Sequence, residues 1–155
     1  MGIFDTHAHY LREDFGEDLE PLVSSLTEKG VERVIAVGCD LESSREEIAL
    51  AHRHSFVYAS AGIHPENAAG LPADWERQLE ALLADERVCA LGEIGLDHHY
   101  PEPPRDIQHE VFRKQLEMAK RLDKAVIIHS RDACEETMEL LREFKPRGVV
   151  HCFSG

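Results

Sequence analysis

The sequence lacks the segments that mark membrane and secreted proteins. Its longest apolar runs have the length of a strand, such as "AVII" before His129, so none is long enough to span a bilayer. Its first residues, "MGIFDTH", contain no basic region followed by an apolar stretch, so no secretory signal is visible. These absences predict a cytoplasmic protein with no membrane partner.

Cysteine is also scarce, and the four cysteines lie too far apart to form a Cys-x-x-Cys pair. In a cytosolic setting, isolated cysteines are more often small buried residues than disulfides or zinc ligands. We therefore expect the four cysteines to be buried and to form neither disulfides nor a zinc site: Cys39, Cys89, Cys134 and Cys152.

Basic residues are few relative to acidic ones. The chain has 17 Lys and Arg against 30 Asp and Glu, which gives a net charge of −13. This balance argues against a protein that coats nucleic acid through a broad basic face. It leaves open an enzyme that grips a few phosphates through metal ions, because the ions supply local positive charge. Weak non-specific DNA binding is expected, and no protein partner is evident.

What is present is the composition of one folded domain, with 43% hydrophobic and 30% charged residues among 155. Short apolar runs alternate with longer amphipathic stretches, as in βαβ architecture. The runs are rich in Val, Ile and Ala with little alternation, which predicts a parallel sheet covered by helices. The predicted strands are "GIF" leading to His7, "VERVIAVG", "FVYASAGIHP", "VCALGEIGLD", "AVIIHS" and "GVVHCFSG", and the predicted helices are 17–29, 42–53, 74–85, 105–122 and 132–144.

The helix over 105–122 has the clearest apolar face. Its apolar residues recur close to helical spacing, which predicts a stripe that faces the core. The members of this stripe are Ile107, Val111, Leu116, Ala119 and Leu122, with Phe112 and Met118 alongside.

The ten histidines fall into two groups. One group lies in polar helices or loops, where a solvated surface position is expected: His52, His54, His98, His99 and His109. The other group follows apolar strands, and a glutamate of the fourth strand joins it: His7, His9, His64, His129 and His151, with Glu93.

The second group predicts a metal site. The carboxyl ends of parallel strands gather at one rim, where active sites form. His7 and His9 are two apart on one strand, so both can face one ion. Imidazole and carboxylate are suitable ligands for divalent metals, and the two oxygens of Glu93 could bridge a pair of ions. Singly, these histidines would be ordinary strand-end or core residues; together, on four strands, they favour the metal site.

Two further residues keep alternatives open. Pro65 restricts His64 to an extended conformation at the rim, where it could be a ligand, a phosphate contact, a general acid or a structural turn residue. Arg131 falls on the same strand parity as His129 and could reach a substrate phosphate. A salt bridge with Asp132 or another nearby acid is the alternative for Arg131.

Six segments together resemble the TatD-type metal-dependent deoxyribonucleases, within the amidohydrolase-like metal-dependent hydrolases. They are "FDTHAHY", "GIHPENA", "LGEIGLDHHY", "QHEVFRKQLEMA", "VIIHSRDA" and "VVHCFSG", in family order across the chain. The resemblance implies a TIM-like barrel, two divalent ions and hydrolysis of phosphodiester bonds in DNA. Histidine-rich ligation suits Zn or Mn, and phosphodiester substrates often come with Mg. The resemblance also implies one ion on His7 and His9, the other on His129 and His151, and Glu93 between them. His64 matches a histidine thought to help with substrate.

The chain departs from the family pattern in two places. "LDHHY" stands where the family often has an aromatic residue directly after the aspartate. A complete (β/α)₈ barrel needs about 250 residues, whereas this sequence stops after its sixth predicted strand and lacks a late aspartate of the family site. We therefore expect an α/β barrel domain over 1–155 that is truncated after the sixth of eight strands and is a poorly stable monomer.

The leading functional hypothesis is a two-metal deoxyribonuclease that acts on DNA strand ends as an exonuclease, with ions about 3.5–4 Å apart. Glu93 and His64 would be catalytic, and His64 and Arg131 would bind substrate. A second hypothesis keeps the metals but changes the substrate to a small cyclic amide, lactone or phosphoester, because fold does not fix function. A third is an inactive fragment that serves as an interaction module.

Overall fold

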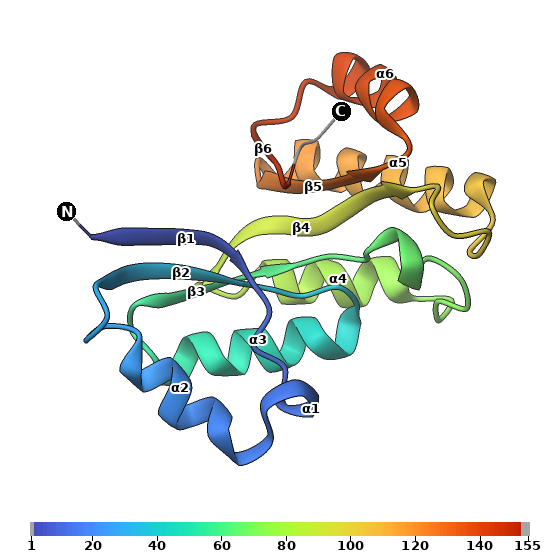
Figure 1. Cartoon of the computed structure of the whole chain (residues 1–155). Helices are drawn as coiled ribbons and strands as arrows, with labels where there is room; N and C mark the ends of the chain where they lie inside the picture. Colours follow the sequence, from blue (N-terminus) through green and yellow to red (C-terminus); the bar gives the residue numbers. More distant parts are fainter. Residues whose placement is uncertain (1, 153–155) are drawn as a thin grey trace.

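The computed structural model describes residues 2–152, and its centre is a six-stranded parallel sheet. Each strand pairs with the strand that follows it in the chain, so the sheet order is β1-β2-β3-β4-β5-β6. The strands are β1 (Ile3–Ala8), β2 (Val31–Val37), β3 (Val57–Ala61), β4 (Val88–Asp97), β5 (Ala125–Arg131) and β6 (Gly148–Val150). The sheet curls as it crosses from β1 to β6, which confirms the predicted barrel-type α/β architecture (Figure 1).

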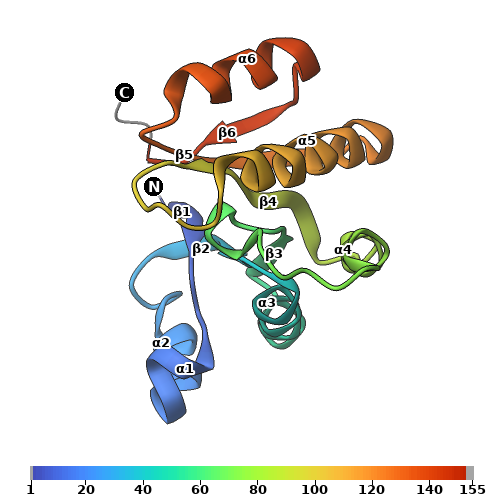
Figure 2. The same cartoon turned by 90° about the vertical axis from the view of Figure 1, so that its right-hand side faces the viewer.

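The helices lie in an arc around the outer face of this curled sheet (Figure 2). This is the arrangement that βαβ units give when each crossover packs on the same side. None of these helices is long and apolar enough to cross a membrane. They are α1 (Arg12–Phe15), the 3₁₀ turn η1 (Gly16–Asp18), α2 (Leu19–Ser25), α3 (Leu41–Arg53), the 3₁₀ turn η2 (Pro65–Asn67), α4 (Trp75–Leu83), α5 (Arg105–Leu122) and α6 (Cys134–Phe144).

All six predicted strands and all five predicted helices are present, with differences at their ends. The first predicted helix, 17–29, ends earlier at Ser25 and is preceded by two short turns. The first strand continues beyond "GIF" to Ala8 and so contains His7. The last strand is short, and residues 153–155 of "GVVHCFSG" lie outside the described residues.

Local chemistry sets the ends of the longer helices. Asp40 begins α3 with a capping box. Its side chain accepts a hydrogen bond from the Ser43 N–H, and the Ser43 hydroxyl accepts one from the Asp40 N–H. Asp123 and Lys145 end α5 and α6 in the left-handed conformation. These caps fix where the chain turns back toward the next strand.

The apolar face of α5 packs on the sheet as predicted, with one exception. Phe112 and Leu116 are 1% exposed and Val111 is 7% exposed, so they belong to the core. Ile107 is 36% exposed, and its assignment to the core stripe was wrong. It lies in the first turn of α5, before the helix comes under the cover of the sheet.

The structure also corrects two predictions of exposure. Cys89, Cys134 and Cys152 are exposed and Cys39 is partly buried, so the expected burial of the cysteines was wrong, although none forms a disulfide. The side chains of His98 and His54 are only 2% and 14% exposed, so neither is a solvated surface histidine. Loop polarity predicted solvation there, but the neighbouring elements fold over both rings.

Candidate metal centre

Five histidines and one glutamate of the predicted set converge on the concave side of the sheet. His7 ends β1 and His9 follows it, while Glu93 lies in the middle of β4 and His129 lies in β5. His64 and His151 follow β3 and β6 in the chain. Alternation along each strand places these side chains on one face of the sheet, as the sequence predicted.

His7, His9 and one oxygen of Glu93 form the first group of donors. His7 Nε2 lies 3.2 Å from Glu93 Oε2 and 3.1 Å from His9 Nε2. His9 Nε2 lies 3.8 Å from the same oxygen. The three donor atoms lie within 4.8 Å of one another, a spacing that can hold one metal ion. His9 Nδ1 donates to the carbonyl of Val37 at 2.8 Å, which leaves its Nε2 lone pair free for a ligand role.

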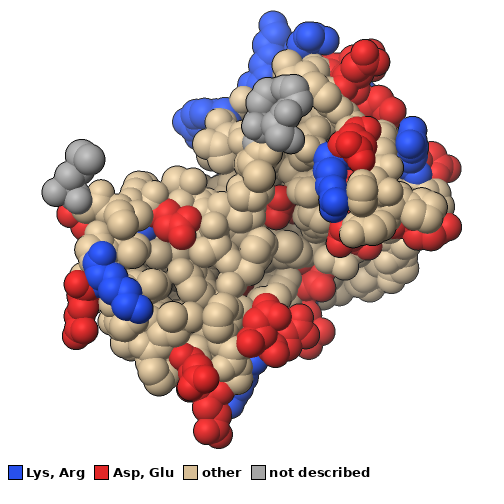
Figure 3. All heavy atoms as spheres, viewed as in Figure 1, with Lys and Arg blue, Asp and Glu red and all other residues tan. Residues whose placement is uncertain are grey.

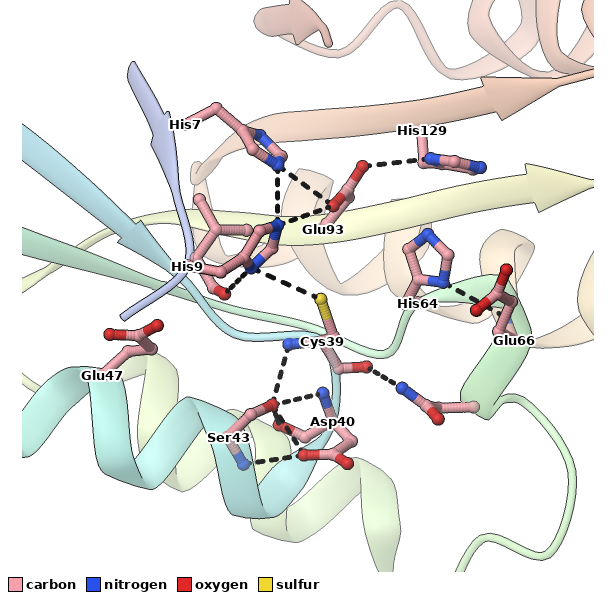
Figure 4. A network of polar contacts seen from close by, with 12 residues as sticks. His7, His9, Cys39, Asp40, Ser43, Glu47, His64, Glu66, Glu93 and His129 are labelled. Carbon is pink, nitrogen blue, oxygen red and sulfur yellow. Dashed lines mark hydrogen bonds and ion pairs between the residues drawn. The ribbon is translucent and has the colours of Figure 1, made fainter. Parts of the chain in front are cut away.

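His64, His129 and the other oxygen of Glu93 form the second group. His129 Nδ1 lies 3.1 Å from Glu93 Oε1, and the rings of His64 and His129 are 4.3 Å apart at their centroids. This trio also satisfies the 4.8 Å spacing. Glu93 therefore faces a different histidine with each of its oxygens (Figure 4). That arrangement suits a carboxylate that bridges two ions.

Glu93 is buried yet held in its charged form. Its residue is 3% exposed, and burial alone would raise the pKa of its carboxyl group. Hydrogen bonds from His129 and His7 outweigh burial and hold that pKa well below its usual range. A buried, ionised carboxylate among imidazole rings is a chemically competent site for divalent cations.

His64 has a defined tautomer. Its Nδ1 accepts the backbone N–H of Glu66 at 3.3 Å, which places the ring proton on Nε2. Burial, helped by the nearby His129, lowers the pKa of His64 to about 4, so the ring is neutral at physiological pH. The structural turn bond expected as an alternative is thus present, and it orients an N–H donor beside His129.

Neither His151 nor Arg131 is a member of the two closely spaced donor groups among residues 2–152. The ring of His151 stacks on that of His7, with centroids 3.4 Å apart and planes 12° apart. The guanidinium of Arg131 lies 5.4 Å from the ring centroid of Tyr100. Arg131 makes no ion pair within residues 2–152, and Asp132 pairs with His99 instead, at 3.1 Å.

Sequence reasoning missed Asp97 as a partner of the site. Its Oδ2 lies 2.9 Å from His129 Nε2, so the imidazole is held between two carboxylates. Asp97 is 2% exposed, and burial would raise its pKa, but bonds from His129 and the His99 N–H hold it lowered. The signal was available, because Glu93 and Asp97 are four apart on one strand and share its parity. Asp97 thus has the position of the outer carboxylate partner that a metal-binding histidine would use.

Gly95 allows β4 and β5 to approach closely at this point. It pairs in register with His129 and has φ +150°, a conformation that side chains rarely adopt. A Cβ on Gly95 would overlap the carbonyl oxygen of His129. The glycine therefore sets the distance between the strands that carry Glu93 and His129.

The chain is similar to known proteins over almost its whole length. The family model described as TatD related DNase matches residues 4–155. The chain is 38% identical to the uncharacterized metal-dependent hydrolase YabD of Bacillus subtilis and 31% identical to the 3'-5' ssDNA/RNA exonuclease TatD of Escherichia coli K12. Each match covers 99% of the chain and about 60% of the relative, so the chain spans less than two thirds of these proteins.

Solved structures show the same fold. The crystal structure of YjjV, a TatD homologue from Escherichia coli K12, matches with a TM-score of 0.88 and 32% identity over 99% of this chain and 61% of that one. A TatD family hydrolase from Entamoeba histolytica matches with a TM-score of 0.90 at 20% identity, over 99% of this chain and 59% of that one. The six strands and their helices therefore follow the architecture of the corresponding part of these proteins.

Proposed function

The chain belongs to the TatD-related DNase family, and from this premise we propose that its histidine–carboxylate centre serves the metal-dependent hydrolysis of phosphodiester bonds in single-stranded nucleic acid. The observation that carries the proposal is the position of Glu93. Each of its two oxygens faces a separate imidazole group, as a bridging ligand of two divalent ions requires.

The donor set fits such ions. His7, His9 and Glu93 Oε2 would hold one, and His129 with Glu93 Oε1 would hold the other. His64 is left outside this second set because its Nδ1 already accepts the Glu66 N–H. The family resemblance adds His151, whose ring stacks on His7 in this structure. Imidazole and carboxylate donors suit Zn or Mn, and carboxylates also suit Mg. When bound there, divalent ions supply a water of lowered pKa and neutralise negative charge on the scissile phosphate.

The protein groups around the ligands act on the substrate. His64 presents its Nε2–H beside His129 and donates a hydrogen bond to a phosphate oxygen. Arg131, two residues beyond His129, supplies a positive charge that no acidic side chain of residues 2–152 pairs with. Asp97 keeps the His129 ring in place through its Nε2.

Charge distribution supports action at a strand end. The hollow seen in Figure 3 is lined mostly by side chains that are neither basic nor acidic, and Lys and Arg lie at the periphery of that face. The net charge of −13 further weakens general attraction to the phosphate backbone. Without a broad basic surface, binding depends on a few local contacts, which favours exonuclease action over a tight hold on duplex.

The proposal is tested with an end-labelled single-stranded oligonucleotide and the purified 155-residue chain. We expect cleavage with Mn²⁺ or Mg²⁺, loss of cleavage with a chelator, and loss in Glu93→Gln. His109→Ala is the matched control, because His109 lies on α5 in neither donor group and should leave cleavage unchanged. Near-normal turnover by Glu93→Gln, or cleavage that survives chelation, would refute the assignment.

A further inference from the structure

Tyr100 is an exposed aromatic residue on the segment that follows β4, the strand that carries Glu93 and Asp97. It lies three residues after the end of β4 and is 51% exposed. The other large exposed hydrophobic residues of the described chain lie elsewhere, on β1, β6 and α5: Ile3, Phe4, Val149 and Ile107. A single exposed aromatic residue is ordinary on a protein surface, so the case for Tyr100 rests on the groups that surround it.

Two side chains contact the ring of Tyr100 in this exposed position. The guanidinium of Arg131 lies 5.4 Å from its centroid, and the His99 ring meets it edge-on at 4.8 Å and 84°. His99 is fixed in turn by Asp132, whose Oδ2 lies 3.1 Å from His99 Nδ1. The His98 N–H donates to the Arg131 carbonyl at 2.9 Å, which ties this segment to the end of β5. An aromatic ring that is already ordered loses little entropy when a ligand stacks on it.

The same contacts connect Tyr100 to the metal centre. Asp97 accepts the His99 N–H with Oδ1 at 2.9 Å and bonds His129 Nε2 with Oδ2 at 2.9 Å. One buried carboxylate therefore links the segment that carries Tyr100 to a metal-ligand candidate. Arg131 has the strand parity of His129, so both side chains leave β5 on the same face.

An exposed aromatic ring with an adjacent arginine matches the chemistry of a single-stranded nucleic acid. Bases stack on aromatic side chains without regard to sequence, and arginine adds a cation–π contact and a phosphate contact. A base inside a duplex cannot offer its face in this way, whereas an unpaired base can.

We propose that Tyr100 and Arg131 form a stacking platform that receives an unpaired base next to the scissile phosphate, with Arg131 on the neighbouring phosphate. The proposal rests on the proposed function and names the substrate feature that the site selects. Selection is for an unpaired base of any identity, because the platform offers a ring face and a charge but no side chain that reads base edges.

The test measures binding, so that it does not depend on turnover. Fluorescence anisotropy in the presence of a chelator compares an intact single-stranded oligonucleotide with one of the same length whose terminal nucleotides are abasic. We expect Tyr100→Ala to weaken binding of the intact strand about five- to hundredfold and to leave binding of the abasic strand unchanged. Tyr100→Phe should bind as the wild type does.

Phe4→Ala is the control, because Phe4 is 58% exposed but lies on β1 away from this segment. Equal affinity of wild type and Tyr100→Ala for the intact strand would overturn the platform, as would an equal loss for both strands. Failure of the proposed function is a separate result, since it appears as absent metal-dependent cleavage while the anisotropy comparison still decides for or against Tyr100.

Discussion

The two halves of the candidate metal centre are held in different ways. The inner half, Glu93, Asp97 and His129, lies on β4 and β5 within the sheet. Its two carboxylates are 3% and 2% exposed, and each ring nitrogen of His129 meets one of them. Packing and charge-assisted hydrogen bonds therefore fix all three side chains.

The outer half, His7, His9 and His151, belongs to the two strands at the sheet edges. Apart from Glu93, the contacts of the His7 ring are with the other two imidazoles, at 3.1 Å for His9 Nε2 and by stacking for His151. Imidazole pairs of this kind are weaker than contacts between imidazole and carboxylate. The inner half is thus fixed by carboxylates of the protein. In the outer half the Val37 carbonyl holds His9, while His7 and His151 stack on each other and depend more on what binds beside their rings.

The largest effect is expected from disturbing the approach of β4 to β5. In Gly95→Ala, the new methyl group would overlap the His129 carbonyl oxygen at a φ of +150°. We expect the free energy of unfolding to fall by about 3 kcal/mol or more, measured by urea denaturation. Gly70→Ala is the control, because Gly70 has φ +71° with open space around it and should cost only about 1–2 kcal/mol. Equal losses would show that the inner half is not set by this approach.

A second effect concerns the support of the outer half. Glu47 is fully buried on α3, and its Oε1 accepts the N–H of Tyr10, directly after His9, at 2.7 Å. Burial raises the pKa of Glu47 from 4.5 to about 7. Between these two pH values the folded protein keeps a proton on Glu47 that the unfolded chain has lost. Stability is therefore highest below about pH 4.5 with respect to this group and falls as pH rises toward 7.

Glu47→Gln removes this titration while keeping an oxygen for Tyr10. We expect it to raise the free energy of unfolding by up to about 3 kcal/mol near pH 8 and to make little difference near pH 4. Denaturation curves at the two pH values measure the change. A variant that is less stable than wild type at both would contradict the assignment of Glu47 as a buried acid that resists ionisation.

The smallest of these effects concerns orientation of a ligand in the inner half. Asp97→Asn removes the negative charge that faces His129 Nε2 and keeps a side chain of nearly the same size. We expect metal affinity, measured by titration calorimetry, to fall about 10- to 100-fold, with the fold retained by circular dichroism. Asp132→Asn alters an exposed aspartate that pairs with His99 and should leave metal affinity unchanged. Unchanged affinity in Asp97→Asn would place Asp97 outside the metal centre.

The sequence was sufficient for the sheet, the helices and the convergence of Glu93 with the five histidines that follow apolar strands. Apolar periodicity depends on burial, and parity depends on strand geometry, so both can be read without coordinates. His7 and His9 do lie on one side, and Glu93 does face two imidazole groups.

What could not be predicted depends on contacts between elements. Strand parity places Asp97 on the same face as Glu93, but its distance to His129 depends on the pairing of β4 with β5, whose register shifts between Leu91 and Ile94. The burial of His98 depends on how the segment after β4 folds back, and the exposure of Ile107 on where α5 meets the sheet. Local composition carries no information on these tertiary distances.

The order of the strands has a consequence for the growing chain. Because every strand pairs with the one before it in sequence, each can dock as it leaves the ribosome, without waiting for a distant partner. The inner half is complete once β5 has emerged, whereas His151 follows 22 residues after His129. During synthesis, a nascent chain would thus assemble the inner half of the candidate centre before His151 is available to join the outer half.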